Sequence, residues 1–565
     1  MTDIEIARMK RKEMKRIKEV ATDLGIKEEE LTLYGEYIAK VDYESILKRT
    51  ETNREGKLIV VTATTPTPLG EGKTVTSIGL TQGIGKIGKK VSLCIRQPSL
   101  GPVFGIKGGA SGGGYSQVLP MEEFNLHFTG DMYAVNTAHN LLCAMTEASV
   151  FHKNALGIDP QRIKLRRVID INDRALRNII IAVGGKDGVI RETGFDITPA
   201  SEIMAILGLS CSIKELKERL SRIVVGYTYG GEAVFAKDIR AVGAMAVLLK
   251  DALKPNLIQT IEGQPVFVHT GPFGNIAHGN SSIIADKIAL KFSDYVVTEA
   301  GFGADLGLEK FIHIKCRAAG YSPSCIVIVT SIRSLKMHGG AFRIPPGKIL
   351  SDEIMFQKNK EALINGFPNL KIHIENSKLF GIPVLVAINK FPKDEWEEIE
   401  LLQDLISHCG AESEISEAFE RGGEGTIRLA RKVVELSEKK SELKFLYGLK
   451  QPVREKIEIL AKNIYRAGGV NYSKQAIKEI ENIEKIFGSE FPICMAKTQL
   501  SISDKPEIKG SPSDYVFEVN EVRHSNGAGF VVPVAGEIST MPGLGSRPAA
   551  INIDISDDSV INGIF

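Results

Sequence analysis

The sequence has few of the residues that mark secreted, membrane-spanning or zinc-binding proteins. Its 565 residues include only seven cysteines. No two of them form a Cys-x-x-Cys pair, so neither a zinc ribbon nor a disulfide framework is expected. No run approaches the roughly 20 apolar residues that span a bilayer, and residues 1–30 are charged where a signal peptide would be apolar. We therefore expect a cytoplasmic protein with no membrane partner.

A large net charge is absent as well. The chain has 71 Lys and Arg against 69 Asp and Glu, a net charge of +2. Such a balance produces no global field that would attract nucleic acid, so a nucleic-acid partner is not expected. Hydrophobic residues make up 43% and charged residues 25%, which is typical of globular proteins.

Glycine, in contrast, is in excess. The chain has 55 glycines, whereas an average usage of about 7% would give roughly 40. Half of the residues from Gly101 to Gly114 are glycine. Because glycine lets a backbone adopt positive φ or approach another group closely, this cluster is the first place to look for a ligand.

Apolar runs typical of buried parallel strands alternate with segments of helical periodicity. The runs are 58–63, 91–95, 179–183, 266–269, 295–298, 325–330 and 382–388. This alternation predicts an α/β fold with a P-loop-type parallel sheet, helices on both of its faces, and two further α/β domains.

The length predicts about three domains. We expect a discontinuous nucleotide-binding domain of residues 1–140 and 290–375. Residues 141–289 are predicted to form an inserted helical α/β domain, and residues 376–565 a C-terminal α/β domain.

The most specific local motif joins the strand 58–63 to a helix expected from Lys73. Gly72-Lys73-Thr74 is the second half of a G-x-x-x-x-G-K-[ST] phosphate loop, and Thr67 stands where the first glycine belongs. Gly70 and Gly72 allow successive N–H groups to face one anion, and the helix N-terminus adds its dipole. Lys73 supplies a positive charge, and the Thr74 hydroxyl can ligate Mg²⁺.

A nucleoside triphosphate or a phosphorylated intermediate is the predicted ligand of this loop. The residues expected to bind it are Thr67, Pro68, Leu69, Gly70, Glu71, Gly72, Lys73 and Thr74. The alternative is an ordinary turn that contains Gly-Lys-Thr by chance.

Arg96 directly follows the apolar run 91–95. The carboxyl edge of an open parallel sheet is where such folds bind ligands, and an arginine there can hold a carboxylate or phosphate through two hydrogen bonds. A structural salt bridge is the alternative role.

Longer segments resemble a known family. Residues 105–115 (GIKGGASGGGY) and 329–340 (VTSIRSLKMHGG) resemble the two signatures of formate–tetrahydrofolate ligase, also called formyltetrahydrofolate synthetase. Further similar blocks, in the same order along the chain, are 125–131, 297–307, 492–499 and 541–544.

The resemblance implies an enzyme that uses ATP and Mg²⁺ to join formate to tetrahydrofolate through formyl phosphate. The products would be 10-formyltetrahydrofolate, ADP and phosphate. It also implies a homotetramer and activation by a monovalent cation such as K⁺ or NH₄⁺.

The resemblance also assigns site residues. Lys73 and Arg96 would be catalytic and lie beside formyl phosphate. The other residues expected near formyl phosphate are Gln97, Gly105, Gly108 and Gly109. The C-terminal domain is expected to complete the folate site, whose residues would be Asp131, Phe302, Phe391 and Phe419. Taken singly, each phenylalanine is typical of a core position. His127 and His269 could move a proton, but structural roles are equally open and neither is assigned.

Two substitutions depart from the family pattern. Gln97 stands where relatives usually have glutamate, and Phe419 where they usually have tryptophan. These changes keep open two alternatives, a diverged paralogue that binds nucleotide and a pterin with weak or altered ligase activity, and a nucleotide-switch ATPase. Asn389-Lys390 resembles part of a guanine-reading motif, but Pro392 replaces its aspartate, which does not support guanine selectivity.

Overall fold

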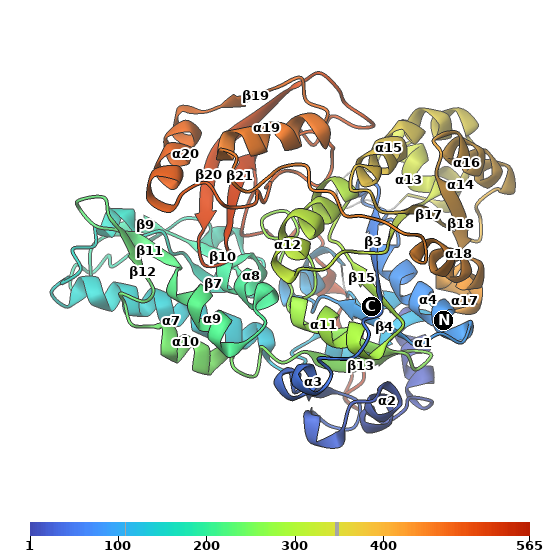
Figure 1. Cartoon of the computed structure of the whole chain (residues 1–565), viewed down its shortest axis with the longest axis horizontal. Coiled ribbons are helices and arrows are strands. Elements are labelled where there is room, and N and C mark those ends of the chain that lie inside the picture. The colour runs from blue at the N-terminus through green and yellow to red at the C-terminus, as the bar shows by residue number, and fades with distance from the viewer. Residues whose placement is uncertain (108, 345–349, 565) are drawn as a thin grey trace.

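One long, mostly parallel sheet organises the chain in the computed structural model, which describes residues 1–107, 109–344 and 350–564 (Figure 1). Its strand order is β1-β2-β13-β14-β4-β15-β3-β16-β17-β18. Every neighbouring pair from β14 to β18 is parallel. The strands are β1 (Leu31–Leu33), β2 (Ala39–Val41), β13 (Asn256–Thr260), β14 (Pro265–Val268), β4 (Val91–Ile95), β15 (Tyr295–Glu299), β3 (Lys57–Ala63), β16 (Cys325–Thr330), β17 (Val384–Asn389) and β18 (Glu412–Ser416). The predicted α/β class is confirmed.

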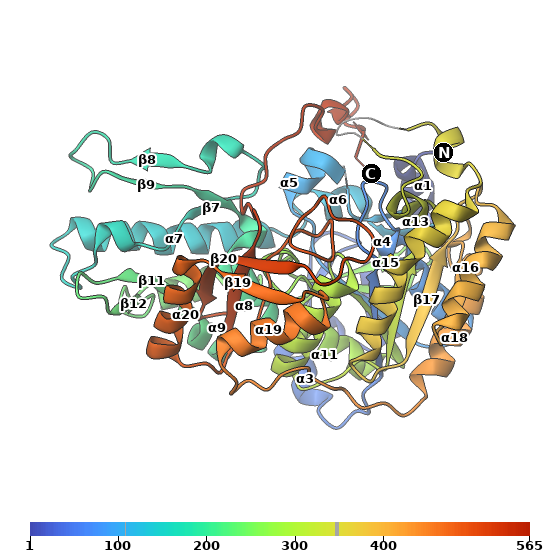
Figure 2. The same cartoon turned by 90° about the horizontal axis from the view of Figure 1, so that it is seen from above.

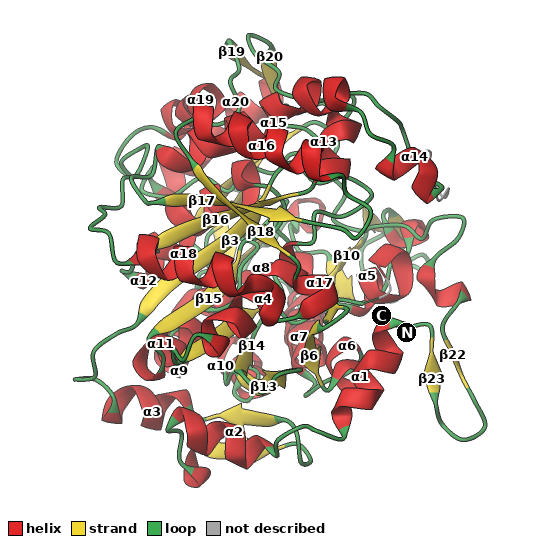
Figure 3. Cartoon of the chain, turned by 90° about the vertical axis from the view of Figure 1, so that its right-hand side faces the viewer, coloured by secondary structure: helices red, strands yellow, loops and turns green. Residues whose placement is uncertain are grey.

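Helices cover both faces of this sheet (Figure 3). Alternate residues of β3 point to opposite faces, as the two-residue period of a strand requires. Ile59 and Val61 pack in one core with α4 (Lys73–Lys86) and α18 (Ile427–Ser437). Leu58 and Val60 belong to the other core, with α11 (Ile283–Phe292) and α15 (Lys360–Lys378). Burial on both faces explains why these strands are continuous apolar runs.

Further helices flank the sheet and its edges. They are α1 (Asp3–Arg11), α2 (Ile17–Leu24), α3 (Tyr43–Arg49), α13 (Ile332–His338), α14 (Asp352–Phe356), α16 (Trp396–His408) and α17 (Ala418–Arg421). After β15 the chain forms two π-helical turns, Ala304–Leu308 and Phe311–Cys316, that continue into α12 (Arg317–Ala319). No helix within the described ranges is both long and apolar enough to cross a bilayer.

The sheet draws on more of the chain than the predicted nucleotide-binding domain. β13 and β14 come from the range assigned to the inserted domain, and β17 and β18 from the range assigned to the C-terminal domain. Strands of one sheet pack into the same two cores on its faces, so we propose that residues 256–289 and 376–437 belong with the nucleotide-binding unit. The division into domains itself stays a prediction.

The inserted region extends away from the sheet (Figure 2). Its helices are α7 (Asp131–Phe151), α8 (Glu202–Leu209), α9 (Ile213–Ser221) and α10 (Val242–Leu249). The strand expected at 179–183 forms as β8 (Ile179–Ile181), but it pairs with β9 (Arg191–Thr193) in a separate antiparallel hairpin. Two further pairs, β7 (Arg167–Ile169) with β10 (Phe195–Ile197) and β11 (Val224–Tyr227) with β12 (Ala233–Phe235), complete the region.

The C-terminal region has a small sheet of its own. Its order is β19-β20-β21, formed by Gly469–Tyr472, Val516–Ser525 and Phe530–Ala535. The helices α19 (Val453–Asn463) and α20 (Lys474–Phe487) accompany it. Its apolar core is continuous with the core on the α11 and α15 face of the main sheet, so the two regions pack tightly together.

Candidate active site

The predicted phosphate loop joins β3 to α4 at the carboxyl edge of the sheet. Gly70 and Gly72 both have positive φ, +71° and +78°. A Cβ at Gly72 would lie only 2.0 Å from Nδ2 of Asn389, which donates to the Glu71 carbonyl at 3.1 Å. Glycine is therefore required at position 72 both by its backbone conformation and by this close neighbour.

Glu71 closes the loop on itself. The backbone N–H and the hydroxyl of Thr67 both donate to Oε1 of Glu71, at 2.8 and 2.9 Å. Burial raises the pKa of Glu71 to about 7. Thr67 thus has a definite role at the position of the first P-loop glycine, and the buried carboxyl loses much of its negative charge near neutral pH.

Lys73 and Thr74 open α4 and meet the end of β15, the strand beside β3. The Lys73 ammonium donates to the carbonyls of Ala300 and Phe302, at 2.5 and 3.3 Å. The Thr74 hydroxyl donates to Oε2 of Glu299 at 3.0 Å. Sequence reasoning missed Glu299, although an acidic residue at the end of an apolar strand is a usable signal. A hydroxyl beside a carboxylate is a donor set that suits Mg²⁺.

Arg96 leaves β4, the strand on the other side of β15. It donates to the Pro272 carbonyl at 3.1 Å, and its guanidinium lies against Gly301, where a Cβ would be 3.3 Å from both terminal nitrogens. Burial lowers the pKa of Arg96, and the charge of Glu299 opposes this shift. Arginine remains protonated under these conditions, so the site holds a half-buried positive charge.

Unpaired polar atoms accumulate around Arg96. Within the described part of the chain, the buried atoms without a hydrogen-bond partner include Nε of Arg96, Oε1 of Gln97, Oγ1 of Thr270, Oδ1 of Asn275, both ring nitrogens of His278 and both side-chain amide atoms of Asn280. Gln97 and Thr270 are joined by a backbone hydrogen bond of 2.7 Å, and Gly301 is bonded to Gly279 at 2.9 Å. Because buried polar groups are nearly always paired, this concentration indicates a binding site for a small polar ligand.

Two of the predicted aromatic residues follow adjacent strands. Phe391 comes after β17 and Phe419 after β18, and an ion pair of 2.7 Å between Lys390 and Glu417 ties the two segments together. Phe391 is half-buried, with the guanidinium of Arg333 3.7 Å from its ring centre. Phe419 is 41% exposed. The two rings are therefore available at the same sheet edge as the phosphate loop.

Arg333 connects this aromatic segment to the loop, because it also donates to the Leu69 carbonyl at 3.2 Å. It lies in α13, within the segment 329–340 that carried the family resemblance, but it was not singled out from sequence.

Phe302, the third predicted aromatic residue, follows the end of β15. It is half-buried, has a φ of +60°, and its ring borders Gly274, where a Cβ would lie 3.1 Å from it.

The glycine cluster packs against other parts of the chain. The backbone N–H of Tyr115 donates to the Phe419 carbonyl at 2.8 Å, and a Cβ on Gly114 would lie 2.0 Å from the same oxygen. A Cβ on Gly105 would lie 2.6 Å from Nδ2 of Asn172. Gly109 is half-buried, and Gly108 lies outside the described residues. Close chain packing thus accounts for several of these glycines.

The family described as formate–tetrahydrofolate ligase matches residues 1–565. The chain belongs to this family. The formate–tetrahydrofolate ligase of Desulforamulus reducens is 51% identical over 566 residues, covering 100% of this chain and 99% of that protein. The resemblance found in the sequence is therefore confirmed, and the chain is an enzyme of the ligase class.

In this member of the formate–tetrahydrofolate ligase family, Asp131 is held in a buried ion pair. Its Oδ1 lies 2.7 Å from the ammonium of Lys40, and their side chains are 4% and 2% exposed. Its Oδ2 accepts from Nδ2 of Asn256 at 2.7 Å. Lys40 was not foreseen, because nothing near it in sequence marks it as buried. A role for Asp131 in folate binding stays a prediction.

The two histidines left open in the sequence differ sharply. Nε2 of His269 donates to the Ala252 carbonyl at 2.7 Å, which leaves Nδ1 to accept from the Ser282 hydroxyl at 2.6 Å. Burial lowers the pKa of His269 to about 4, so this ring is a neutral structural group. His127 is exposed.

A cavity of about 630 Å³ lies between the loop that contains Asn275 and the C-terminal region. Its lining includes Thr498, one basic residue, Lys505, and three acidic residues, Asp504, Glu518 and Glu537. The predicted site residues do not line it. Its acidic lining disfavours an anionic ligand such as formate, phosphate or a carboxylate-bearing tail.

Proposed function

We propose that the chain ligates formate to tetrahydrofolate at the expense of ATP, giving 10-formyltetrahydrofolate, ADP and phosphate through formyl phosphate. The observation that carries this proposal is the meeting of Lys73, Glu299 and Arg96 at the carboxyl ends of the adjacent strands β3, β15 and β4. The family membership supports formate and tetrahydrofolate as substrates.

The first step is phosphorylation of formate. A carboxylate is a poor acyl donor, and phosphorylation turns it into a mixed anhydride with a good leaving group. The N–H groups of residues 67–74 would bind the phosphates at the N-terminus of α4, while Lys73 and Arg96 offset the charge of two anions brought together. The Thr74 hydroxyl and the Glu299 carboxylate would hold Mg²⁺, which supplies further charge neutralisation when bound.

The second step is attack of the folate amine on the formyl carbon. A C–N bond forms and negative charge develops on the formyl oxygen; the C–O bond to phosphate then breaks, and the proton of the amine leaves with the phosphate. The Arg96 guanidinium is half-buried, and its buried Nε has no partner among the described residues. It would stabilise that oxygen. We propose that Gln97, Gly105, Gly108 and Gly109 border the formyl phosphate. Of these residues, Gly108 lies outside the described ranges.

The folate ring would bind at the aromatic edge of the site. Phe391 and Phe419 lie on adjacent segments and Phe302 on the β15 side, so we propose that these rings contact the pterin and that Asp131 binds its amino edge. Phenylalanine at position 419 offers less stacking area than tryptophan would.

We also propose that the protein is a homotetramer, that K⁺ or NH₄⁺ activates it, and that it is located in the cytoplasm. Self-association is supported by exposed apolar side chains on and beside the β8–β9 hairpin, where Ile180 is 65% and Ile190 54% exposed. Exposed apolar side chains gathered on one hairpin are typical of protein interfaces.

The deciding experiment measures 10-formyltetrahydrofolate and ADP with every subset of ATP, formate and tetrahydrofolate. We expect ADP release to require both formate and the folate. Equal ATP hydrolysis with nucleotide alone would favour the nucleotide switch, and absence of a formylated product with any tetrahydropterin would refute the ligase. For the diverged paralogue the test is Gln97→Glu, motivated by the unpaired Oε1 of Gln97: a large gain in formyl transfer would support that alternative.

A further inference from the structure

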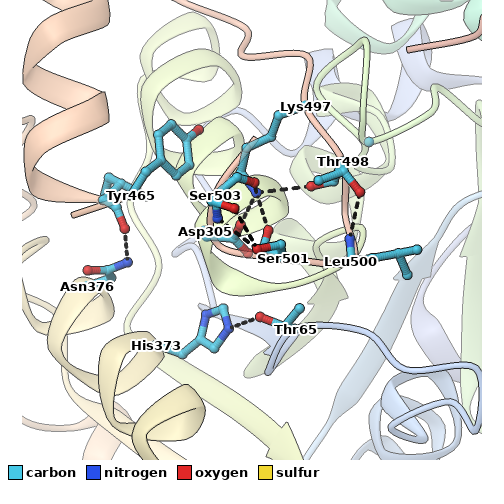
Figure 4. A network of polar contacts seen from close by, with 12 residues as sticks. Thr65, Asp305, His373, Asn376, Tyr465, Lys497, Thr498, Leu500, Ser501 and Ser503 are labelled. Atoms are coloured by element: carbon cyan, nitrogen blue, oxygen red, sulfur yellow. Dashed lines mark hydrogen bonds and ion pairs between the residues drawn. The ribbon is translucent and has the colours of Figure 1, made fainter. Parts of the chain in front are cut away.

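Each polar atom of Thr65, the second residue after β3, makes a hydrogen bond, and Figure 4 shows the one between its hydroxyl and His373. Its N–H donates to Oδ1 of Asn369 at 3.3 Å, and its hydroxyl accepts from Nδ2 of the same residue at 2.9 Å. The hydroxyl lies 3.0 Å from Nε2 of His373, and the Thr65 carbonyl lies 3.0 Å from Nε2 of His338. The start of the phosphate loop is thus anchored by side chains from α13 and α15.

The direction of the hydrogen bonds that join Thr65 to His338 and to Asn369 is fixed by chemistry. A carbonyl only accepts, so Nε2 of His338 donates to Thr65. The Thr65 hydroxyl accepts the amide N–H of Asn369 and shares a hydrogen bond with Nε2 of His373. Burial lowers the pKa of His373 to about 4. His373 is therefore neutral near pH 7, and the arrangement does not change with pH in that range.

The same groups reach the C-terminal region. Nδ2 of Asn369 also donates to the Gly510 carbonyl at 2.8 Å. The buried ammonium of Lys497 pairs with Asp305 at 2.8 Å and donates to the Ser501 carbonyl at 2.5 Å (Figure 4). Asp305 is a neighbour of His373, because a Cβ on Gly303 would lie 2.6 Å from Oδ1 of Asp305 and 3.2 Å from Cε1 of His373.

These contacts give the loop and the C-terminal region common supports. The segment 300–305 that ends at Asp305 also provides the two carbonyls that bind the Lys73 ammonium. A shift of residues 497–510 would therefore disturb both the first residues of the loop and the position of Lys73.

We propose that Thr65, Asn369 and His373 are positioning residues that hold the phosphate loop in its MgATP-binding conformation, with Asn369 linking that conformation to the docked C-terminal region. The proposal rests on the function proposed above for this loop. None of the three side chains is assigned a contact with the reacting atoms. Their loss is therefore expected to weaken ATP binding and to leave chemistry at saturating ATP little changed.

α15 offers a matched control. Asn376 lies two helical turns beyond Asn369, is equally buried, and donates to the Ile464 carbonyl of the C-terminal region at 2.8 Å rather than to the phosphate loop. Leucine is similar in size to asparagine, so each variant removes one buried amide and its hydrogen bond to the C-terminal region. Only Asn369→Leu also removes the hydrogen bonds to Thr65.

The experiment compares Asn369→Leu with Asn376→Leu by calorimetric titration of MgATP, by steady-state kinetics and by thermal unfolding. We expect Asn369→Leu to raise the Kd and KM for ATP about tenfold, since it removes two hydrogen bonds to Thr65. Its kcat at saturating ATP and its KM for formate should change less than about twofold, and Asn376→Leu should change the ATP constants by less than about twofold. Equal ATP effects in the two variants would overturn the proposal.

A second pair guards against variants that fail to fold. Thr65→Val removes the hydroxyl from a side chain of nearly the same shape, whereas Thr65→Ser keeps it. Weakened ATP binding in Thr65→Val alone supports the proposal, and equal binding in both contradicts it. If the unaltered chain binds no MgATP, the function proposed for the loop is refuted. If the unaltered chain binds MgATP and both pairs show equal binding, only the positioning role is refuted.

Discussion

Replacing Gly72 by alanine is expected to weaken MgATP binding far more than the same change at Gly70. Both glycines have positive φ, +71° at Gly70 and +78° at Gly72. Their surroundings differ, because a Cβ at Gly70 would have no neighbour within 4 Å among the described residues, whereas one at Gly72 would lie 2.0 Å from Nδ2 of Asn389. The pair thus separates the cost of backbone conformation from the cost of a steric clash.

The expected magnitudes follow from these two costs. The left-handed conformation costs an alanine about 1–2 kcal/mol, and overpacking adds typically about 1–3 kcal/mol. A variant loop spends less time in the binding conformation, and the apparent affinity falls by that fraction. We expect Kd for MgATP to rise about tenfold in Gly70→Ala and about 300-fold in Gly72→Ala.

Asn389 provides the internal check. Asn389→Ala alone removes one hydrogen bond to the Glu71 carbonyl, worth about 1 kcal/mol. Added to Gly72→Ala, it also removes the clashing atom, so the double variant should bind MgATP at least about tenfold more tightly than Gly72→Ala does. Calorimetric titration of all four variants measures these constants. Equal losses at positions 70 and 72, or simple additivity with Asn389→Ala, would refute the steric argument.

Three further predictions concern charged groups of the site. The pKa of Glu71 is raised to about 7 in the folded chain, against an ordinary 4.5. Because the unfolded chain therefore releases this proton more readily, the free energy of unfolding falls as pH rises from about 4.5 to about 7. The melting temperature of Glu71→Gln should therefore exceed that of the unaltered chain increasingly from pH 5 to 8, by an amount equivalent to about 3 kcal/mol, and a pH-independent difference would contradict this. Arg96→Lys, which keeps the charge and loses the planar fork, should lower kcat at least about 100-fold, while a tenfold or smaller loss in steady-state assays would remove Arg96 from the catalytic group. Lys40→Met leaves the buried Asp131 carboxylate without its cation and should destabilise the protein by about 3–5 kcal/mol, a loss that a second change, Asp131→Asn, should partly restore in thermal unfolding.

Local sequence was sufficient to predict features that are formed by consecutive residues. The strands 91–95 and 325–330 and the start of α4 at Lys73 were predicted at the bounds that the structure has. Burial on both faces makes such strands uniformly apolar, which a sequence displays directly. The phosphate loop was found for the same reason, since its glycines, lysine and threonine are consecutive.

Sequence also determined the family, because the two signature segments and the order of the smaller blocks are properties of the chain alone. It did not determine how far the sheet extends. β17 and β18 were assigned to another domain, yet β17 pairs with β16 and β18 pairs with β17 in the same sheet. Which strands are neighbours depends on non-local hydrogen bonds that no local pattern records.

Only the tertiary structure decided which side chains surround the phosphate loop. Glu299 beside Thr74, Arg333 at Leu69, and Asn369 at Thr65 come from segments more than 200 residues away from their partners. In the sequence, a single polar residue within an apolar helix or strand gives no indication of its partner. The partner is set when folding removes the residue from water, because a buried donor or acceptor must then form a hydrogen bond.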